Sequence, residues 1–270
     1  MKGQLIDTSH GKIMVEDHGG SGFPMLLIHG NSSSRHVFAR QMKSPLKDLC
    51  RLIAFDLPGH GESDYARDPH RTYTLPGFAN LVVELLDTLA IKRVIVLGWS
   101  LGGHIAIELL ARVDCIEGLI LTGSPPIRRG AFAEGFILSP HFALASRRHF
   151  SPAELQQFEQ VIFGDPLLRH AIARADGRFR ERLFEAGREG QGVDQRATVE
   201  ASLVPVAVIN GASDPLINLD YIDSVAFPNL WSARCHRLAA GHASFWHAAP
   251  AFNALVAHFV EDVTSRQVRA

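Results

Sequence analysis

Short apolar runs alternate with amphipathic stretches along this 270-residue chain, and that alternation restricts the fold more than any other feature of the sequence. Continuous apolar runs, typical of strands buried on both faces of a sheet, occupy residues 24–29, 51–55, 93–97, 117–122 and 206–210. Stretches with helical spacing occupy residues 75–90, 101–113 and 250–263. Strands that alternate with helices form βαβ units, so the sequence predicts an α/β protein with a mostly parallel central sheet flanked by helices.

The N-terminal region has a different pattern. Residues 4–8 and 12–17 alternate between apolar and polar with a period of two, and His10 and Gly11 lie between them as a turn. This pattern predicts an antiparallel hairpin at the start of the chain.

Residues 126–202 interrupt the alternation, because they contain no convincing strand. Helix-like pieces occupy residues 135–147, 151–163, 166–175 and 179–187, and a glycine-rich stretch follows at 187–192. Ser151, followed by Pro and then by Glu154, is typical of a helix start with a capping box. We therefore expect a helical cap at 126–202, inserted into a core formed by residues 1–125 and 203–270.

Charge and composition exclude several classes of protein. The chain has 27 Lys and Arg against 28 Asp and Glu, which gives a formal net charge of −1. The basic residues are scattered, so neither nucleic acid nor an anionic membrane is expected as a partner. A hydrophobic content of 46% is enough for one sizeable core.

The three cysteines, Cys50, Cys115 and Cys235, are far apart and form no CxxC pair. Neither a zinc site nor a disulfide framework is therefore indicated. Residues 1–19 lack the apolar run of a signal peptide, and no segment has the roughly 20 apolar residues of a membrane span. We expect a soluble cytoplasmic protein that uses no metal or cofactor.

The pentapeptide at 98–102, Gly-Trp-Ser-Leu-Gly, carries the first chemical signal. It follows the strand expected at 93–97 and opens the helix expected at 101–113, as a nucleophile elbow does. A sharp turn there projects the Ser100 hydroxyl, while glycines leave room for neighbouring backbone. The alternative is a tight glycine turn with an incidental serine.

A serine hydroxyl needs a base and a group that orients the base. Asp214 lies just past the strand expected at 206–210, and His242 lies between a short strand at 235–238 and the last helix. The chain order Ser, Asp, His is the order of this fold. Ser100, Asp214 and His242 are therefore the candidate catalytic triad.

Other residues compete for these roles. Asp220 and Asp223 follow Asp214 closely, but we expect them on a helix that starts near residue 219. His247 is interpreted as a residue at the entry of the last helix. Two further histidines are assigned to structure, His60 to a tight turn and His104 to packing on the helix after Ser100.

An oxyanion requires two preorganised N–H donors. The backbone amide of Leu101, directly after the nucleophile, is one candidate. The second is the amide of Asn31, in the loop after the strand expected at 24–29. The alternative is a polar turn that only leads into a helix.

Five segments together resemble a known superfamily. They are HGNSSS at 29–34, DLPGHGES at 56–63, GWSLGGHIAIE at 98–108, NGASDP at 210–215 and AGHASF at 240–245. With these segments, the chain resembles the α/β-hydrolases over nearly its whole length. HGNSSS, GWSLGGHIAIE and the following TGSPP at 122–126 resemble the AidH-type N-acyl-homoserine lactonases, which are serine-dependent, metal-free enzymes.

That resemblance implies the α/β-hydrolase fold and a small-molecule acyl lactone or ester as substrate. It implies triad roles for Ser100, Asp214 and His242, and oxyanion roles for Asn31 and Leu101. One position departs from the AidH-type pattern, which has Glu where this chain has Asp214; either carboxylate can orient an imidazole.

Rival functions remain open from the sequence. A carboxylesterase, an amidase and a C–C bond hydrolase share the same triad, and a small-molecule receptor can keep it intact. Epoxide hydrolases and haloalkane dehalogenases are disfavoured because their nucleophile is Asp, where this chain has Ser100. We expect apolar cap residues to form the core of the cap, with some of them lining an acyl pocket: Phe132, Phe136, Ile137, Leu138, Phe142, Phe158 and Phe163.

Overall fold

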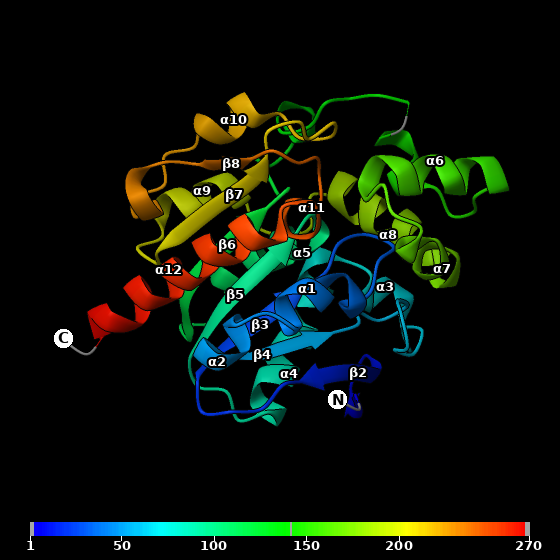
Figure 1. Ribbon diagram of the computed structural model, residues 1–270. Coiled ribbons are helices and arrows are strands. Elements are labelled where there is room, and N and C mark those ends of the chain that lie inside the picture. The colour runs from blue at the N-terminus through cyan, green and yellow to red at the C-terminus, as the bar shows by residue number, and fades with distance from the viewer. Residues whose placement is uncertain (1–2, 141, 268–270) are drawn as a thin grey trace.

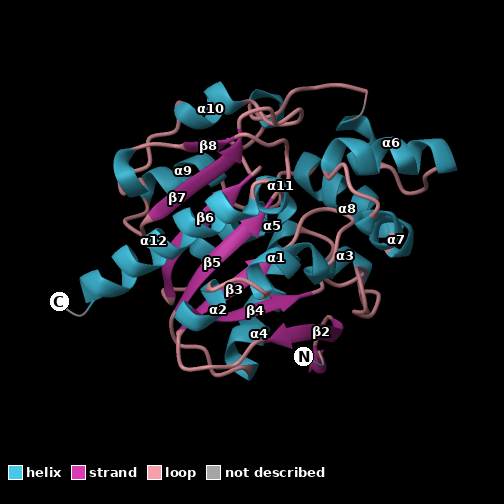
Figure 2. Ribbon diagram, viewed as in Figure 1, coloured by secondary structure: helices cyan, strands magenta, loops and turns pink. Residues whose placement is uncertain are grey.

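The computed structural model describes residues 3–140 and 142–267, in which one eight-stranded sheet runs through the molecule (Figures 1 and 2). The strands are β1 (Gln4–Thr8), β2 (Gly11–Asp17), β3 (Phe23–Ile28), β4 (Cys50–Phe55), β5 (Val94–Trp99), β6 (Ile116–Thr122), β7 (Val206–Gly211) and β8 (His236–Leu238). Their order across the sheet is β1-β2-β4-β3-β5-β6-β7-β8. Pairing is antiparallel at β1–β2 and β2–β4 and parallel elsewhere, which confirms the predicted α/β sheet.

Helices cover both faces of this sheet, which is why its central strands are apolar throughout (Figure 1). The α-helices are α1 (Ala39–Met42), α2 (Leu46–Leu49), α3 (Pro69–Thr72), α4 (Leu75–Thr88), α5 (Leu101–Leu110), α6 (Pro152–Ile162), α7 (Leu167–Arg174), α8 (Gly177–Arg188), α9 (Gln195–Ala201), α10 (Leu219–Asp223), α11 (Ser244–His247) and α12 (Ala249–Gln267). Short 3₁₀ turns are η1 (Arg35–Phe38), η2 (Phe132–Glu134), η3 (Phe142–Ser146) and η4 (Trp231–Ala233). In Figure 1, α12 crosses in front of the sheet and α4 and α5 lie behind it.

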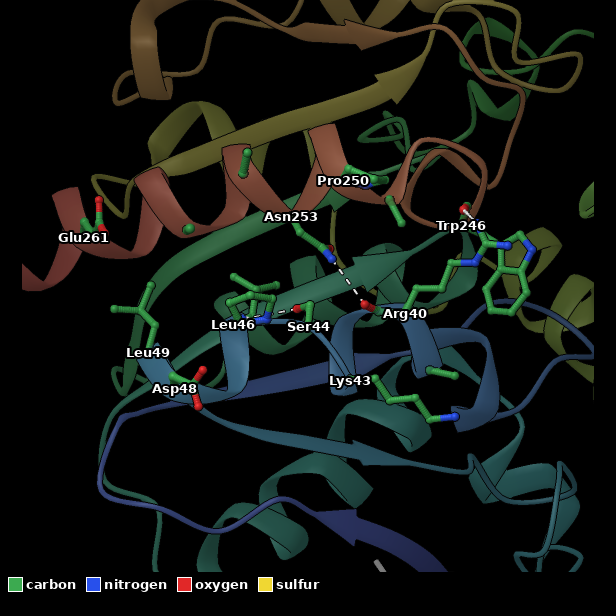
Figure 3. Close-up of a pocket in the computed structure, with 15 residues that line it drawn as sticks. Arg40, Lys43, Ser44, Leu46, Asp48, Leu49, Trp246, Pro250, Asn253 and Glu261 are labelled. Carbon is green, nitrogen blue, oxygen red and sulfur yellow. Dashed lines mark hydrogen bonds between the residues drawn. The ribbon is translucent and has the colours of Figure 1, made fainter.

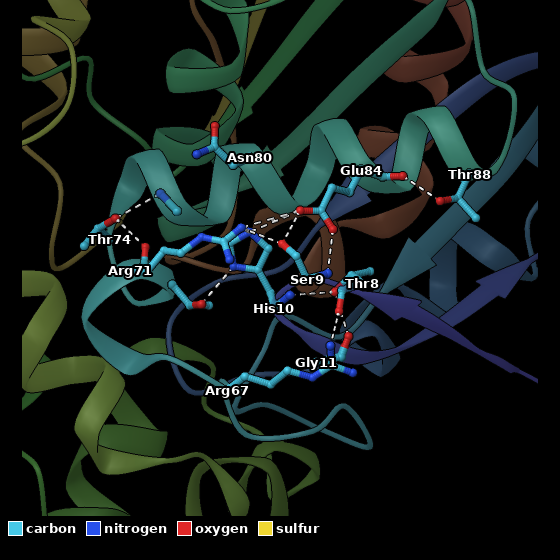
Figure 4. A network of polar contacts seen from close by, with 12 residues as sticks. Thr8, Ser9, His10, Gly11, Arg67, Arg71, Thr74, Asn80, Glu84 and Thr88 are labelled. Atoms are coloured by element: carbon cyan, nitrogen blue, oxygen red, sulfur yellow. Dashed lines mark hydrogen bonds and ion pairs between the residues drawn. The ribbon is translucent and has the colours of Figure 1, made fainter.

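The N-terminal hairpin is anchored to α4 by polar contacts (Figure 4). The backbone N–H of Ser9 donates to the Glu84 carboxylate at 2.7 Å, and Arg71 lies 3.7 Å from the same carboxylate. The buried His10 ring contacts the hydroxyl of Thr72 at 2.8 Å. These contacts fix the predicted His10-Gly11 turn against the body of the protein.

The chain between β6 and β7 is mostly helical, but one predicted helix is wrong. The described residues of this range, 135–140 and 142–147, contain no α-helix; they hold irregular chain and the 3₁₀ turn η3. The backbone N–H of Ile137 donates to Leu216 O at 2.8 Å, and Phe136 forms an isolated bridge with Ile217. The stretch therefore pairs with the loop after β7 instead of with itself.

Two helix starts show how local capping shapes this segment. The predicted capping box is present, because Ser151 Oγ accepts from the Glu154 N–H at 3.3 Å and Glu154 accepts from the Ser151 N–H at 2.8 Å. Helix α9 was not predicted, although Asp194 caps it by accepting from the Ala197 N–H at 3.0 Å.

Among the residues that the structure describes, no helix is both long enough and apolar enough to cross a membrane. Cys50, Cys115 and Cys235 are free thiols. Cys50 is buried, and burial raises its pKa to about 12, so this thiol stays protonated at neutral pH.

Candidate active site

Ser100 lies on a strained turn between β5 and α5. Its backbone is left-handed, with φ 53° and ψ −119°, a conformation that costs a non-glycine residue about 1–3 kcal/mol. A Cβ on Gly98 would lie 2.5 Å from Gly102 O, and a Cβ on Gly102 would lie 2.0 Å from Ile28 O. Glycine is required at both positions by this close approach of backbone, as the pentapeptide predicted.

Asp214 and His242 form a buried pair. Since a carboxylate only accepts, His242 Nδ1–H donates to Asp214 Oδ2, at 2.8 Å, and both side chains are almost fully buried. The other oxygen of Asp214 accepts from the Leu216 N–H at 2.9 Å. Asp214 follows β7 and His242 follows β8, so the loops at one edge of the sheet bring the two residues together.

The position of His242 is held by its neighbours. The indole N–H of Trp99 donates to the His242 carbonyl at 3.1 Å. A Cβ on Gly123, which has φ +63°, would lie 2.7 Å from the imidazole Cε1. The backbone after β6 therefore packs against one side of the ring, where no larger residue fits.

The competing residues have other contacts. Asp220 and Asp223 lie on α10, as expected, and Asp223 pairs with Arg237. His247 lies in α11 and its Nε2 contacts the Phe163 carbonyl at 2.6 Å. None of these three has a hydrogen bond to Asp214 or His242 among those of the described residues.

The loop at 29–34 packs directly on the elbow. A Cβ on Gly30 would lie 3.1 Å from the Cβ of Ser100. Asn31 uses its side-chain N–H₂ to donate to Ala145 O at 3.0 Å, and its side-chain oxygen accepts from the Ser32 hydroxyl at 2.7 Å. The Asn31 side chain thereby anchors the loop, and its backbone is held beside Ser100.

Two buried histidines hold the loop at 29–34 in place through hydrogen bonds. His29 Nε2 accepts from the Leu57 N–H at 3.0 Å, and His60 Nε2 accepts from the Ser32 N–H at 3.2 Å. Burial lowers the pKa of each ring, so both remain neutral acceptors. The structural role predicted for His60 fits this geometry.

Arg180 is a residue that sequence reasoning missed. It is only 2% exposed, and it donates to the Ser32 hydroxyl at 2.7 Å, to Arg148 O at 3.0 Å and to Arg147 O. Burial lowers its pKa to about 10, which still leaves it charged at neutral pH. This one guanidinium joins α8 and the chain before α6 to the loop that carries Asn31. No motif marks such a residue in the sequence, since its partners are two backbone carbonyls and a serine hydroxyl that is 148 positions away.

A cavity of about 590 Å³ unites the candidate residues. Ser100, Leu101, Asn31 and His242 all line it, and Asp214 lies behind His242. Much of the remaining wall comes from residues between β6 and β7, including Ile127, Phe132, Phe136, Phe142, Phe158, Val161, Ile162, Leu183 and Phe184. The site is a serine and a buried Asp–His pair whose histidine lines the same, largely apolar cavity as the serine.

The prediction for the apolar residues of this segment is correct only in part. Phe132, Phe136, Phe142 and Phe158 line the cavity. Phe163 is instead buried against Trp99 and Trp246. Ile137 and Leu138 are 46% and 62% exposed, so they are not core residues, because the stretch that carries them is not helical.

His104 also lines the cavity, although it was assigned to packing. Its Nδ1 contacts Gln195 Oε1 at 2.8 Å, and its ring lies 5.9 Å from the Phe136 ring. Burial lowers the pKa of His104 to about 4.

A second hollow, of about 990 Å³, lies between α12 and the α1–α2 region (Figure 3). The Arg40 guanidinium stacks over Trp246 at 4.2 Å there, and the Ser44 hydroxyl donates to Gln41 O at 2.8 Å. None of the described residues that line it is a histidine, so a serine in this groove has no histidine base beside it. The smaller cavity is therefore the candidate active site.

The fold and the arrangement of Ser100, Asp214 and His242 indicate a class of protein. Residues 25–255 match the alpha/beta hydrolase family, and the chain belongs to that family. It is a hydrolase, a conclusion that its relatives support.

Three relatives show which hydrolases this chain is similar to. The chain is 41% identical to N-acyl homoserine lactonase AidH, solved in complex with N-butanoyl homoserine; the match covers 98% of each chain with a TM-score of 0.95. It is 30% identical to 2-hydroxymuconate semialdehyde hydrolase from a Pseudomonas species, over 92% of this chain and 90% of that one. It is also 30% identical to pimeloyl-[acyl-carrier protein] methyl ester esterase of Neisseria meningitidis, over 88% and 93% of the two chains.

Proposed function

We propose that this protein opens the lactone ring of N-acyl-homoserine lactones, with Ser100, His242 and Asp214 as its catalytic triad. The choice of substrate rests on the likeness to AidH over 98% of both chains. The observation that supports the chemistry is the buried His242–Asp214 pair behind a cavity lined by Ser100.

The first half of the reaction forms an acyl-enzyme. Asp214 holds the Nδ1 proton of His242, so Nε2 is free to take the proton of the Ser100 hydroxyl. The serine oxygen attacks the lactone carbonyl, and the oxyanion accepts hydrogen bonds from the backbone amides of Asn31 and Leu101. Leu101 is the first residue of α5, so its N–H has no carbonyl partner within the helix.

Collapse of the tetrahedral intermediate breaks the ring C–O bond, and His242 returns its proton to the departing alkoxide. The new alcohol remains tethered to the acyl group and can reclose the ring. Water must therefore attack the acyl-enzyme from the His242 side faster than the alcohol does. Its hydroxide adds to the carbonyl, its proton passes through His242 to Ser100, and the open-chain N-acyl-homoserine leaves.

Residues 126–202 form the cap in this proposal. Their phenylalanines line the cavity that ends at Ser100, and an acyl tail would lie against them. Burial of each methylene group contributes about 0.8 kcal/mol, so the cap favours substrates that carry a chain.

The test is mass analysis of the product after incubation with N-hexanoyl-homoserine lactone in the presence of EDTA. Addition of one water with the acyl amide intact is the expected result, at the same rate with and without chelator. Release of hexanoic acid would make the protein an acylase.

A second candidate function is hydrolysis of simple carboxylic esters, favoured by the likeness to a methyl ester esterase over most of both chains. Parallel assays with short methyl esters decide between the two. If the protein hydrolyses methyl esters but leaves the lactone unchanged, the lactonase proposal is wrong.

A further inference from the structure

His104 lies one helical turn after the candidate nucleophile and faces the same cavity. Ser100 caps α5, and the His104 N–H donates to Ser100 O at 3.3 Å. Residues four apart on a helix share a face, about 6 Å apart along the axis. The side chains of His104 and Ser100 both line this cavity, so we expect His104 about one helical turn from the group that Ser100 attacks.

The hydrogen bonds of Gln195 determine which nitrogen of His104 carries the proton. Gln195 Oε1 accepts from the Ile127 N–H at 3.2 Å, and Gln195 Nε2 donates to His104 O at 3.4 Å, which fixes the orientation of the amide. Since Oε1 is an acceptor, His104 Nδ1 must donate to it, at 2.8 Å. The Nε2 atom then carries a lone pair. Burial keeps the pKa of the ring near 4, so the ring stays in this neutral form at physiological pH.

Nε2 of His104 is an acceptor with no donor among the described residues. Two amide side chains on the cavity wall already use their oxygens as acceptors: Asn31 Oδ1 accepts from Ser32, and Gln195 Oε1 accepts two hydrogen bonds. Because His104 lines the cavity, a ligand that brings an N–H to this nitrogen gains a hydrogen bond there.

We propose that His104 Nε2 accepts a hydrogen bond from the amide N–H of the substrate, whose nitrogen is bonded to the carbon next to the lactone carbonyl. The inference rests on the proposed function in one respect, namely that Ser100 attacks that carbonyl. From the attacked carbon through the neighbouring carbon and nitrogen to an acceptor is roughly 5 Å, given ordinary bond lengths and a hydrogen bond near 2.9 Å. This reach matches one helical turn. His104 thus selects lactones and esters that carry an acylated nitrogen beside the scissile carbonyl.

The test compares two ligands that differ at one atom. The first ligand is N-hexanoyl-homoserine lactone, and the second is its oxygen-linked isostere, α-hexanoyloxy-γ-butyrolactone. Each is titrated calorimetrically into the Ser100→Ala protein, which we expect to bind the ligands without turnover. The amide should bind about 5-fold to 100-fold more tightly, because the isostere presents an oxygen lone pair to the lone pair of Nε2. This comparison leaves residue 104 unchanged, so it does not depend on how a variant folds.

Variants then assign the preference to the side chain. Adding His104→Leu should reduce it to below about twofold, whereas His104→Gln, which restores a carbonyl acceptor, should retain part of it. Val161→Ala, at another point of the cavity wall, is the matched control and should weaken both ligands by the same factor.

Equal binding of the two ligands to the Ser100→Ala protein, absence of binding by both, or a preference that survives His104→Leu would each overturn the inference. Failure of the proposed function has a different signature. In that case the protein with Ser100 intact leaves the lactone ring closed, while the binding preference for the amide persists.

Discussion

The carboxyl edge of the sheet and the 126–202 segment build one cavity in different ways. At the sheet edge, Ser100 and the loops that carry Asn31 and His242 follow strands directly, and strand pairing fixes their backbone. The described residues of the 126–202 segment add no strand to the sheet; backbone hydrogen bonds to neighbouring loops and buried side chains, above all Arg180, hold the segment in place. The comparison teaches that the candidate catalytic residues are placed by the strands they follow, while most of the apolar cavity wall is placed by contacts between segments that are distant in the sequence.

The largest expected effect is at the sheet edge. Ser100→Ala should lower kcat by a factor on the order of 10⁴ or more, because the nucleophile is lost. The melting temperature should change little, since Ala tolerates the same backbone. Ser44→Ala, in the other groove, is the matched control and should keep full activity. Full activity in Ser100→Ala would show that the chemistry lies elsewhere.

Replacing the buried acid should have the next largest effect. Asp214→Asn should lower kcat by about 10³-fold to 10⁴-fold, because the amide no longer holds the reactive tautomer of His242. Asp214→Glu should retain part of the activity, since a carboxylate can still reach Nδ1. Asp220→Asn is the control, on exposed α10 surface. If Asp220→Asn is inactive and Asp214→Asn is active, the acid has been chosen wrongly.

Arg180 joins the two regions, so Arg180→Met tests their dependence on each other. The variant leaves Ser32 Oγ and two backbone carbonyls without their donor, at a cost of about 1–3 kcal/mol. We expect kcat/KM to fall roughly 10-fold and the melting temperature to fall by several degrees. Arg182→Met, which removes ion pairs with exposed glutamates, should change both values far less. Equal effects in the two variants would mean that the link through Arg180 has no special role.

The smallest effect should come from the cavity wall. kcat/KM should rise with acyl length until the cavity is full, by at most about fourfold per methylene. Phe136→Ala enlarges the cavity and should move the optimum to longer chains without reducing the best kcat more than a few-fold. Leu138→Ala, at a side chain 62% exposed, should leave the optimum unchanged. If Phe136→Ala leaves the optimal acyl length unchanged, the acyl tail does not lie against Phe136.

Sequence patterns predicted the sheet edge well because its signals are local. Period-two and continuous apolar runs marked the strands, and three glycines around Ser100 marked a turn where backbone passes backbone. The chain order Ser100, Asp214, His242 was the order expected of this fold, and the three residues follow β5, β7 and β8. The same methods failed at residues 135–147, where apolar spacing resembled a helix but the backbone pairs with the loop after β7.

The sequence by itself determined the α/β architecture and the candidate Ser, Asp and His, because strand periodicity and turn glycines act over a few residues. Only the tertiary structure decided that Arg180 reaches Ser32 across 148 positions and that Gln195 sets the tautomer of His104 across 91. It alone decided which phenylalanines face the cavity. Such contacts depend on how distant helices pack, and no local pattern encodes the distance between them.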